Sequence, residues 1–75
     1  MPYIAIKSHP KDEKMKQALV EKINDAVLDV FGCRREAVSI SFEEIAPAEW
    51  QEKVFKPEIE AHKDKMMIFA GKKQY

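Results

Sequence analysis

The residue with the clearest chemical potential is Pro2, which directly follows Met1. Proline is small, so we expect removal of the initiator methionine, which leaves Pro2 with a free secondary amine. An N-terminal amine titrates near ~7.7–8.0 when unperturbed, so part of it is neutral at pH 7. Burial in an apolar pocket or nearby cations lowers its pKa. Pro2 is therefore a candidate base for proton transfer, although an inert proline at a processed terminus is the more ordinary interpretation of this residue alone.

A strand is expected to hold this proline in place. Residues 3–6 are β-branched, aromatic or small, which favours a strand that runs to Lys7 or Ser8. A proline is tolerated where a strand opens, because no ladder donor is needed there. His9-Pro10 should end the strand, since the residue before a proline is kept out of helical geometry. The amine would then lie at the end of a rigid element.

Length and composition point to one folded domain that needs a partner. The chain has 75 residues, of which 45% are hydrophobic and 35% are charged, a balance typical of a folded protein. A chain this short buries only about 60% of its unfolded surface. Its single cysteine, Cys33, excludes an internal disulfide and suits a reducing compartment. His9 and His62 show no metal-ligand spacing with it. Oligomerisation remains as the stabilising device.

The charge and hydropathy of the chain exclude several classes of partner and location. Thirteen basic and thirteen acidic residues cancel, so the basic footprint of a nucleic-acid-binding protein is missing. No apolar run approaches the ~20 residues of a membrane span. No charged region followed by an apolar one marks a secretory signal peptide. We therefore expect a cytoplasmic protein.

A helix over residues 13–31 is predicted from periodicity and from both of its ends. Asp12 is a typical N-cap, and Gly32 stands where a left-handed C-cap belongs. One apolar stripe recurs at helical spacing and is interpreted as core rather than as a cofactor site. Its members are Met15, Leu19, Ile23, Ala26, Val27, Val30 and Phe31.

A second strand over residues 38–43 alternates in polarity and completes a βαβ unit. The two strands should be parallel with a right-handed crossover. The helix would cover the sheet face that carries Val38, Ile40 and Phe42, and it would leave the other face bare. Two strands also have free edges. Both features predict a homo-oligomer.

Several residues between and after these elements admit more than one interpretation. Arg34 and Arg35, the only arginines, either form a solvated turn or donate an anion contact across a subunit boundary. Glu43 and Glu44 are adjacent, so in a strand they point apart and form no catalytic carboxylate pair. Beyond them, short helical turns are expected at residues 47–51 and from Lys56-Pro57 to about residue 65. Residues 66–69 form a short strand or a packing segment, and residues 71–75 form a polar tail.

With these segments placed, the chain resembles the 4-oxalocrotonate tautomerase family over nearly its full length, and within it the PptA-like branch. The likeness rests on Pro2 with its strand, the Asp12-Glu13 helix start, the Ser39-Ile40-Ser41 strand and the Pro47-Ala48-Glu49-Trp50-Gln51 segment. The resemblance implies a small α+β protomer, two parallel strands with one long helix, that pairs into a four-stranded sheet with two helices in a dimer rather than a hexamer. It makes residues 1–75 a single tautomerase-like domain.

The resemblance also implies a cofactor-independent keto–enol tautomerase, an isomerase in which Pro2 is the general base and acid. It places Trp50 beside the proline, and it places Lys11 and Ser39 at positions where the best-known members use two arginines for a dicarboxylate. Lysine gives a point charge and serine is neutral, so a monoacid enol such as phenylenolpyruvate is the expected substrate. The alternatives are hydration or dehalogenation of an unsaturated acid at the same site, or a non-catalytic homo-oligomeric module.

Overall fold

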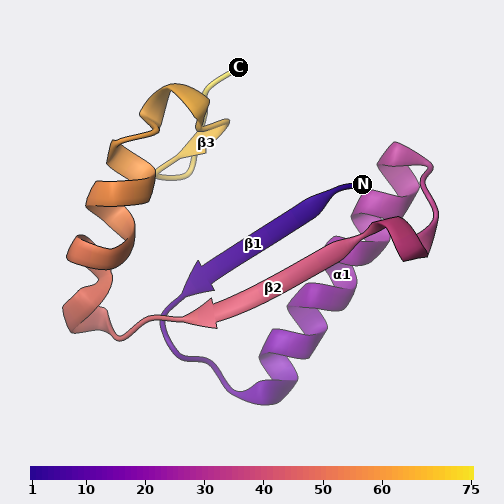
Figure 1. The fold of residues 1–75 in the computed structure, drawn as a ribbon, viewed down its shortest axis with the longest axis horizontal. Coiled ribbons are helices and arrows are strands. Elements are labelled where there is room, and N and C mark those ends of the chain that lie inside the picture. Colours follow the sequence, from indigo (N-terminus) through magenta and orange to yellow (C-terminus); the bar gives the residue numbers. More distant parts are fainter. The chain divides into compact units, whose positions relative to one another are not determined.

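The computed structural model describes residues 1–75, and its contacts divide the chain into two compact units, Met1–Glu44 and Ile45–Tyr75. The first unit contains strand β1 (Tyr3–Ser8), helix α1 (Glu13–Phe31) and strand β2 (Ser39–Glu44) (Figure 1). The single domain over residues 1–75 stays a prediction.

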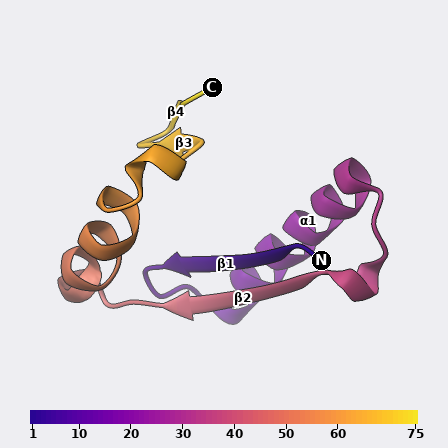
Figure 2. The same ribbon diagram turned by 45° about the horizontal axis from the view of Figure 1, so that its top comes forward.

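The two long strands form a parallel pair, as predicted. Their register runs from Tyr3 opposite Ser39 to Ser8 opposite Glu44. The second strand begins one residue later than the alternation of apolar residues indicated. Helix α1 connects the strands and lies along one face of the pair in both views (Figures 1 and 2). The βαβ unit, and with it the small α+β fold class, is confirmed.

Helix α1 begins and ends where the sequence predicted, through the expected caps. The Asp12 side chain accepts a hydrogen bond from the Met15 backbone nitrogen at 2.9 Å. This bond satisfies one of the orphan donors of the first turn. At the other end Gly32 adopts a φ of 66°, and its N–H donates to the Leu28 carbonyl at 3.0 Å. A residue with a Cβ is disfavoured in this left-handed conformation, so glycine ends the helix at little cost.

The predicted apolar stripe of α1 is only partly core. Ile23 and Val27 are half-buried, whereas Met15 and Val30 are 57% and 77% exposed. The remaining stripe residues, Leu19, Ala26 and Phe31, are exposed as well. The prediction that the whole stripe is core was wrong for the single chain, because strands ~4.8 Å apart give one helix only a narrow surface to cover.

The opposite face of the sheet is bare, as expected. Tyr3 is 69% exposed, and Ala5, Ser39 and Ser41 are exposed beside it. The hydroxyls of Tyr3 and Ser41 are 3.3 Å apart and share a hydrogen bond across the strands. This face therefore presents small and polar side chains to its surroundings.

Asn24 is the most buried polar residue of α1. Its side chain is 7% exposed and its Nδ2 group has no hydrogen-bond partner. A buried donor without a partner costs free energy, and asparagine is also a weaker helix former than leucine. We expect Asn24→Leu to raise the free energy of unfolding by about 1 kcal/mol in urea titrations. Asn24→Asp should lower it, because a buried carboxylate lacks a partner there. A less stable Asn24→Leu would contradict this account.

The second unit is built from short helices and a terminal hairpin. Its helical segments are η2 (Pro47–Glu49), η3 (Gln51–Glu60) and η4 (Lys63–Lys65). The prediction that a new turn starts at Lys56-Pro57 was wrong, because η3 is a π-helix that continues through Pro57. A proline has no N–H to give to the ladder, and π-type turns are among the features that accommodate such an interruption.

The chain ends in a hairpin rather than in a purely polar tail. Strands β3 (Ile68–Phe69) and β4 (Lys72–Lys73) pair antiparallel (Figure 2). The two residues between them, Ala70 and Gly71, have φ values of 51° and 82°. Positive φ at both central residues matches the twist of the flanking strands. The strand alternative for residues 66–69 is thus confirmed for Ile68–Phe69, and the tail prediction is corrected.

Candidate active site

Pro2 is held by the start of β2. It is half-buried, and its carbonyl oxygen accepts a hydrogen bond from the Ser39 backbone nitrogen at 3.1 Å. The amine of Met1 donates to the Ala37 carbonyl oxygen. In a parallel ladder, the nitrogen and the carbonyl of one residue face the residues before and after its partner. The register begins with Tyr3 opposite Ser39, so extending it by one residue sets Pro2 opposite Val38 and its nitrogen towards the Ala37 carbonyl.

The connection from α1 supplies that carbonyl. Between α1 and β2 lies the 3₁₀ turn η1 (Arg35–Ala37), in which Val38 N–H donates to the Arg35 carbonyl at 3.1 Å. Figures 1 and 2 show the N-terminus beside the start of β2 and this connection. Of the predicted site residues in the first unit, Ser39 is therefore the one that the structure brings beside Pro2. Its backbone N–H is engaged, and its side chain lies on the exposed sheet face.

Lys11 lies at the other end of β1. Six residue steps separate Pro2 from Ser8, and at ~3.3 Å per step they span about 20 Å. This is farther than a lysine side chain reaches. The structure thus does not bring Lys11 to Pro2 within one chain, and the sequence resemblance alone gave no hint of this separation.

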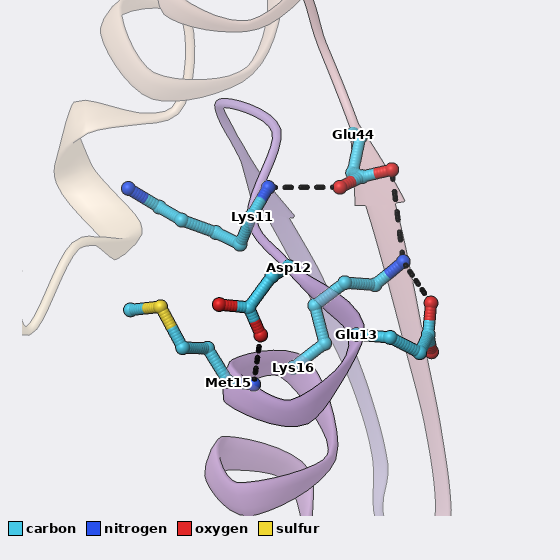
Figure 3. Close-up of polar contacts among 6 residues, drawn as sticks. All are labelled: Lys11, Asp12, Glu13, Met15, Lys16 and Glu44. Carbon is cyan, nitrogen blue, oxygen red and sulfur yellow. Dashed lines mark hydrogen bonds and ion pairs between the residues drawn. The ribbon is translucent and has the colours of Figure 1, made fainter.

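A polar network fixes the backbone at Lys11 (Figure 3). The Lys11 backbone nitrogen donates to Glu44 Oε2 at 2.9 Å, and Lys16 Nζ lies 3.6 Å from Glu44 Oε1. Lys16 Nζ is also 3.6 Å from Glu13 Oε1 and lies 5.3 Å from the centroid of the Phe42 ring. Figure 3 shows the Lys11 side chain extending away from Glu44. The carboxylate therefore positions the Lys11 backbone and leaves its ammonium group available.

This role of Glu44 was not predicted, because the sequence indicated only that Glu43 and Glu44 point apart and form no catalytic pair. The signal that could have found it is the register. Glu44 ends β2 directly opposite Ser8, the last residue of β1. A carboxylate at that position faces the first backbone donors of the loop that leads into α1.

A cavity of 260 Å³ lies beside this network. Its lining residues are Ser8, Lys11, Met15, Lys16, Leu19 and Phe42. Apolar walls with a few polar groups are typical of small-molecule sites. Since Lys16 is occupied by Glu13 and Glu44, Lys11 is the cation that this cavity offers to an organic acid.

Trp50 belongs to the second unit, where it is half-buried between η2 and η3. Cys33 is a half-buried free thiol. No group of three or more His, Cys, Asp or Glu side chains is placed to hold a metal ion. None of the helices has the length and apolar character that crossing a bilayer requires.

A solved structure defines the class of this fold. The chain is similar to the crystal structure of YwhB, described as a homologue of 4-oxalocrotonate tautomerase, with a TM-score of 0.57. The sequences are 30% identical, and the match covers 60% of this chain and 75% of that one. The fold is therefore tautomerase-like.

Sequence comparisons define the family. The family model described as tautomerase enzyme matches residues 2–55. A tautomerase PptA from Pectobacterium atrosepticum is 32% identical over 85% of this chain and 87% of its own length. A probable tautomerase from Xylella fastidiosa is 28% identical over 95% of this chain and 88% of its own length. The chain belongs to the tautomerase family, and it is an isomerase of the tautomerase type.

Proposed function

We propose that this protein interconverts the enol and keto forms of a small 2-oxo monoacid such as phenylenolpyruvate, with Pro2 as the general base and acid. The observation that supports the proposal is the backbone hydrogen bond that fixes Pro2 beside β2. Its carbonyl is bonded to Ser39 N–H at 3.1 Å, so its nitrogen is fixed at the end of β1. A base held in one place spends no orientational entropy at the moment of reaction. Removal of Met1 converts this nitrogen from an amide into a basic secondary amine.

The reaction needs one proton to leave oxygen and one to reach carbon. Neutral Pro2 accepts the proton of the enol hydroxyl, and the resulting enolate bears negative charge on its oxygen. Protonated Pro2 then gives a proton to the adjacent carbon, which yields the keto acid and restores the neutral amine. A cation or a backbone donor stabilises the developing oxyanion. No cofactor is part of this scheme.

The pKa of the Pro2 amine decides whether it works near neutral pH. The Ala37 carbonyl faces the nitrogen and favours its protonated form, which raises the pKa. An apolar wall and nearby cations act in the opposite direction, because they disfavour the charged amine. We propose that Trp50 forms part of that wall, in keeping with the resemblance. We propose that the substrate-binding cations also lower the pKa of the Pro2 amine.

The 20 Å separation gives Lys11 a role only through a second copy of the chain. β1 is paired with β2 on one edge only. Antiparallel pairing of its free edge with β1 of a second copy would form a four-stranded sheet with two helices. Centred between Ala5 and Ile6, this pairing would set Ser8 of the partner subunit opposite Tyr3. Lys11 of the partner subunit would then approach Pro2.

Assembly is therefore part of the proposed site. We expect light scattering at micromolar concentration to give the mass of a dimer, twice the 8.7 kDa of the chain. A hexamer would retain the two-copy unit but correct the expected size. A monomer with full activity would contradict the contribution of Lys11 from a second copy. We also place the protein in the cytoplasm, where its lone thiol stays reduced.

Substrate preference follows from the cations at the site. Lys11 provides one positive charge and Ser39 provides none. We expect kcat/KM for phenylenolpyruvate to exceed that for a dicarboxylate enol such as 2-hydroxymuconate by at least about tenfold, because the second carboxylate would be left desolvated without a partner. Ultraviolet absorbance of each enol measures the rate. A preference for the dicarboxylate would contradict this assignment. Activity only towards hydration or dehalogenation of unsaturated acids would replace the proposed reaction at the same amine.

A further inference from the structure

Arg34 stands one short turn from the carbonyl that faces Pro2. The Ala37 backbone nitrogen donates to the Arg34 carbonyl oxygen at 3.0 Å, and the Ala37 carbonyl accepts from the N-terminal amine. Three residues of 3₁₀ geometry at ~2 Å each, plus one strand spacing of ~4.8 Å, separate Arg34 from Pro2 by on the order of 10 Å. A guanidinium on this residue and a small acid at Pro2 can bridge such a gap.

The two arginines of the chain have different surroundings. Arg35 Nη2 lies 3.5 Å from Glu21 Oε1, and Arg35 lines a cavity on the helix side of the sheet together with Asn24, Val38 and Ile40. Arg34 is exposed, makes no side-chain capping hydrogen bond and takes part in no ion pair. Arg34 is therefore the arginine that is free to bind an anion.

A free guanidinium suits the chemistry of the proposed reaction. Arginine binds a carboxylate through two parallel hydrogen bonds, which fixes its orientation as well as its position. The uncharged side chain of Ser39 cannot supply this charge at the same end of the sheet. A cation there also disfavours protonation of Pro2 and so opposes the effect of the Ala37 carbonyl.

Building on the proposed function, we infer that Arg34 binds the carboxylate of the 2-oxo acid substrate at the Pro2 end of its own sheet. Lys11 from a second copy then lies on the far side of the substrate, where it stabilises the enolate oxygen rather than a carboxylate, so a second carboxylate would still have no partner. The carboxylate is thereby recognised within the chain that supplies the base. This assignment makes Arg34 a determinant of specificity for acids over uncharged enols.

The test compares Arg34→Gln with Arg35→Gln on two substrates, phenylenolpyruvate and its methyl ester in the enol form. Arg34→Gln should raise KM for the acid by roughly 10- to 100-fold, the range for losing a charge-assisted hydrogen-bonded pair. KM for the ester should stay unchanged, because the ester has no charge to bind. Arg34→Lys should restore part of the affinity. Arg35→Gln should change either KM by less than about threefold, since its exposed ion pair contributes little.

Two results would overturn the inference. One is an unchanged KM for the acid in Arg34→Gln, and the other is an equal loss for acid and ester, which would indicate a structural role. Circular dichroism melts show that each variant is folded. Pro2→Ala is measured in parallel. If Pro2→Ala is inactive and Arg34→Gln keeps its KM for the acid, only the assignment of Arg34 is wrong. If Pro2→Ala keeps full activity, the proposed function itself is wrong.

Discussion

Pro2→Ala is expected to lower kcat/KM for phenylenolpyruvate by roughly 10²-fold or more, the usual contribution of general acid–base catalysis. Alanine keeps a terminal amine, but that amine is primary and free to rotate. It is therefore not fixed towards the substrate, and its pKa is not set by the same surroundings. Following the loss of enol absorbance at saturating and limiting substrate separates the effect on kcat from the effect on KM.

Pro10→Ala is the matched control for this substitution. Pro10 is exposed in the loop between β1 and α1, and the same change there should leave the rate within about twofold, as surface substitutions usually do. Equal rates for Pro2→Ala and Pro10→Ala would mean that the terminal amine takes no part in proton transfer.

Blocking the nitrogen of Pro2 is expected to have an effect at least as large. A leucine inserted between Met1 and Pro2 leaves Pro2 inside a peptide bond, where its nitrogen has no basic lone pair. The rate should fall by about 10²- to 10⁴-fold. Intact mass spectrometry verifies that the extension is retained, and the absorbance assay then gives the rate.

Removing the extension with a protease that leaves Pro2 first should restore the activity, which separates blocking from misfolding. The native chain should likewise show a mass that lacks Met1. Full activity in a chain whose intact mass still includes the extension would be incompatible with Pro2 as the base.

The βαβ unit was predictable because its signals are local. The side chain of Asp12 and the positive φ of Gly32 are the features that begin and end α1, and each is dictated by one residue type. The parallel pairing of β1 and β2 follows from the long helix that connects them. Single residues with strong conformational preferences thus determined most of the first unit.

The sequence did not predict features that depend on distances along the fold or on contacts with a second chain. The length of β1 puts its far end, beyond which Lys11 lies, about 20 Å from Pro2. A resemblance between sequences does not state which subunit supplies a residue. The exposed part of the α1 stripe shows the same problem, since periodicity marks an apolar face without saying whether this chain or another covers it. The prediction of a new turn at Pro57 was wrong because a π-helical segment continues where an α-helix would break.

Glu44 and Arg34 show a third kind of failure. Both are charged residues whose ordinary interpretation is a solvated surface. Glu44 became informative only through its hydrogen bond of 2.9 Å to the Lys11 backbone, and Arg34 through its place beside the Ala37 turn. The charge of a residue does not indicate where its side chain lies in the fold. The strand register and the backbone hydrogen bonds were needed to assign these two residues a role.

The central claim, that Pro2 is the most reactive base of the chain near neutral pH, is tested most directly by labelling with a halopyruvate. This reagent resembles a 2-oxo acid and carries an electrophilic carbon. The experiment uses the Cys33→Ala variant, because the thiol of Cys33 is the obvious competitor for the reagent. The account predicts a single adduct on the Pro2 nitrogen, formed with an apparent pKa below ~7.7, the ordinary value for a terminal amine. Labelling spread over the lysines, with Pro2 unmodified, would contradict it.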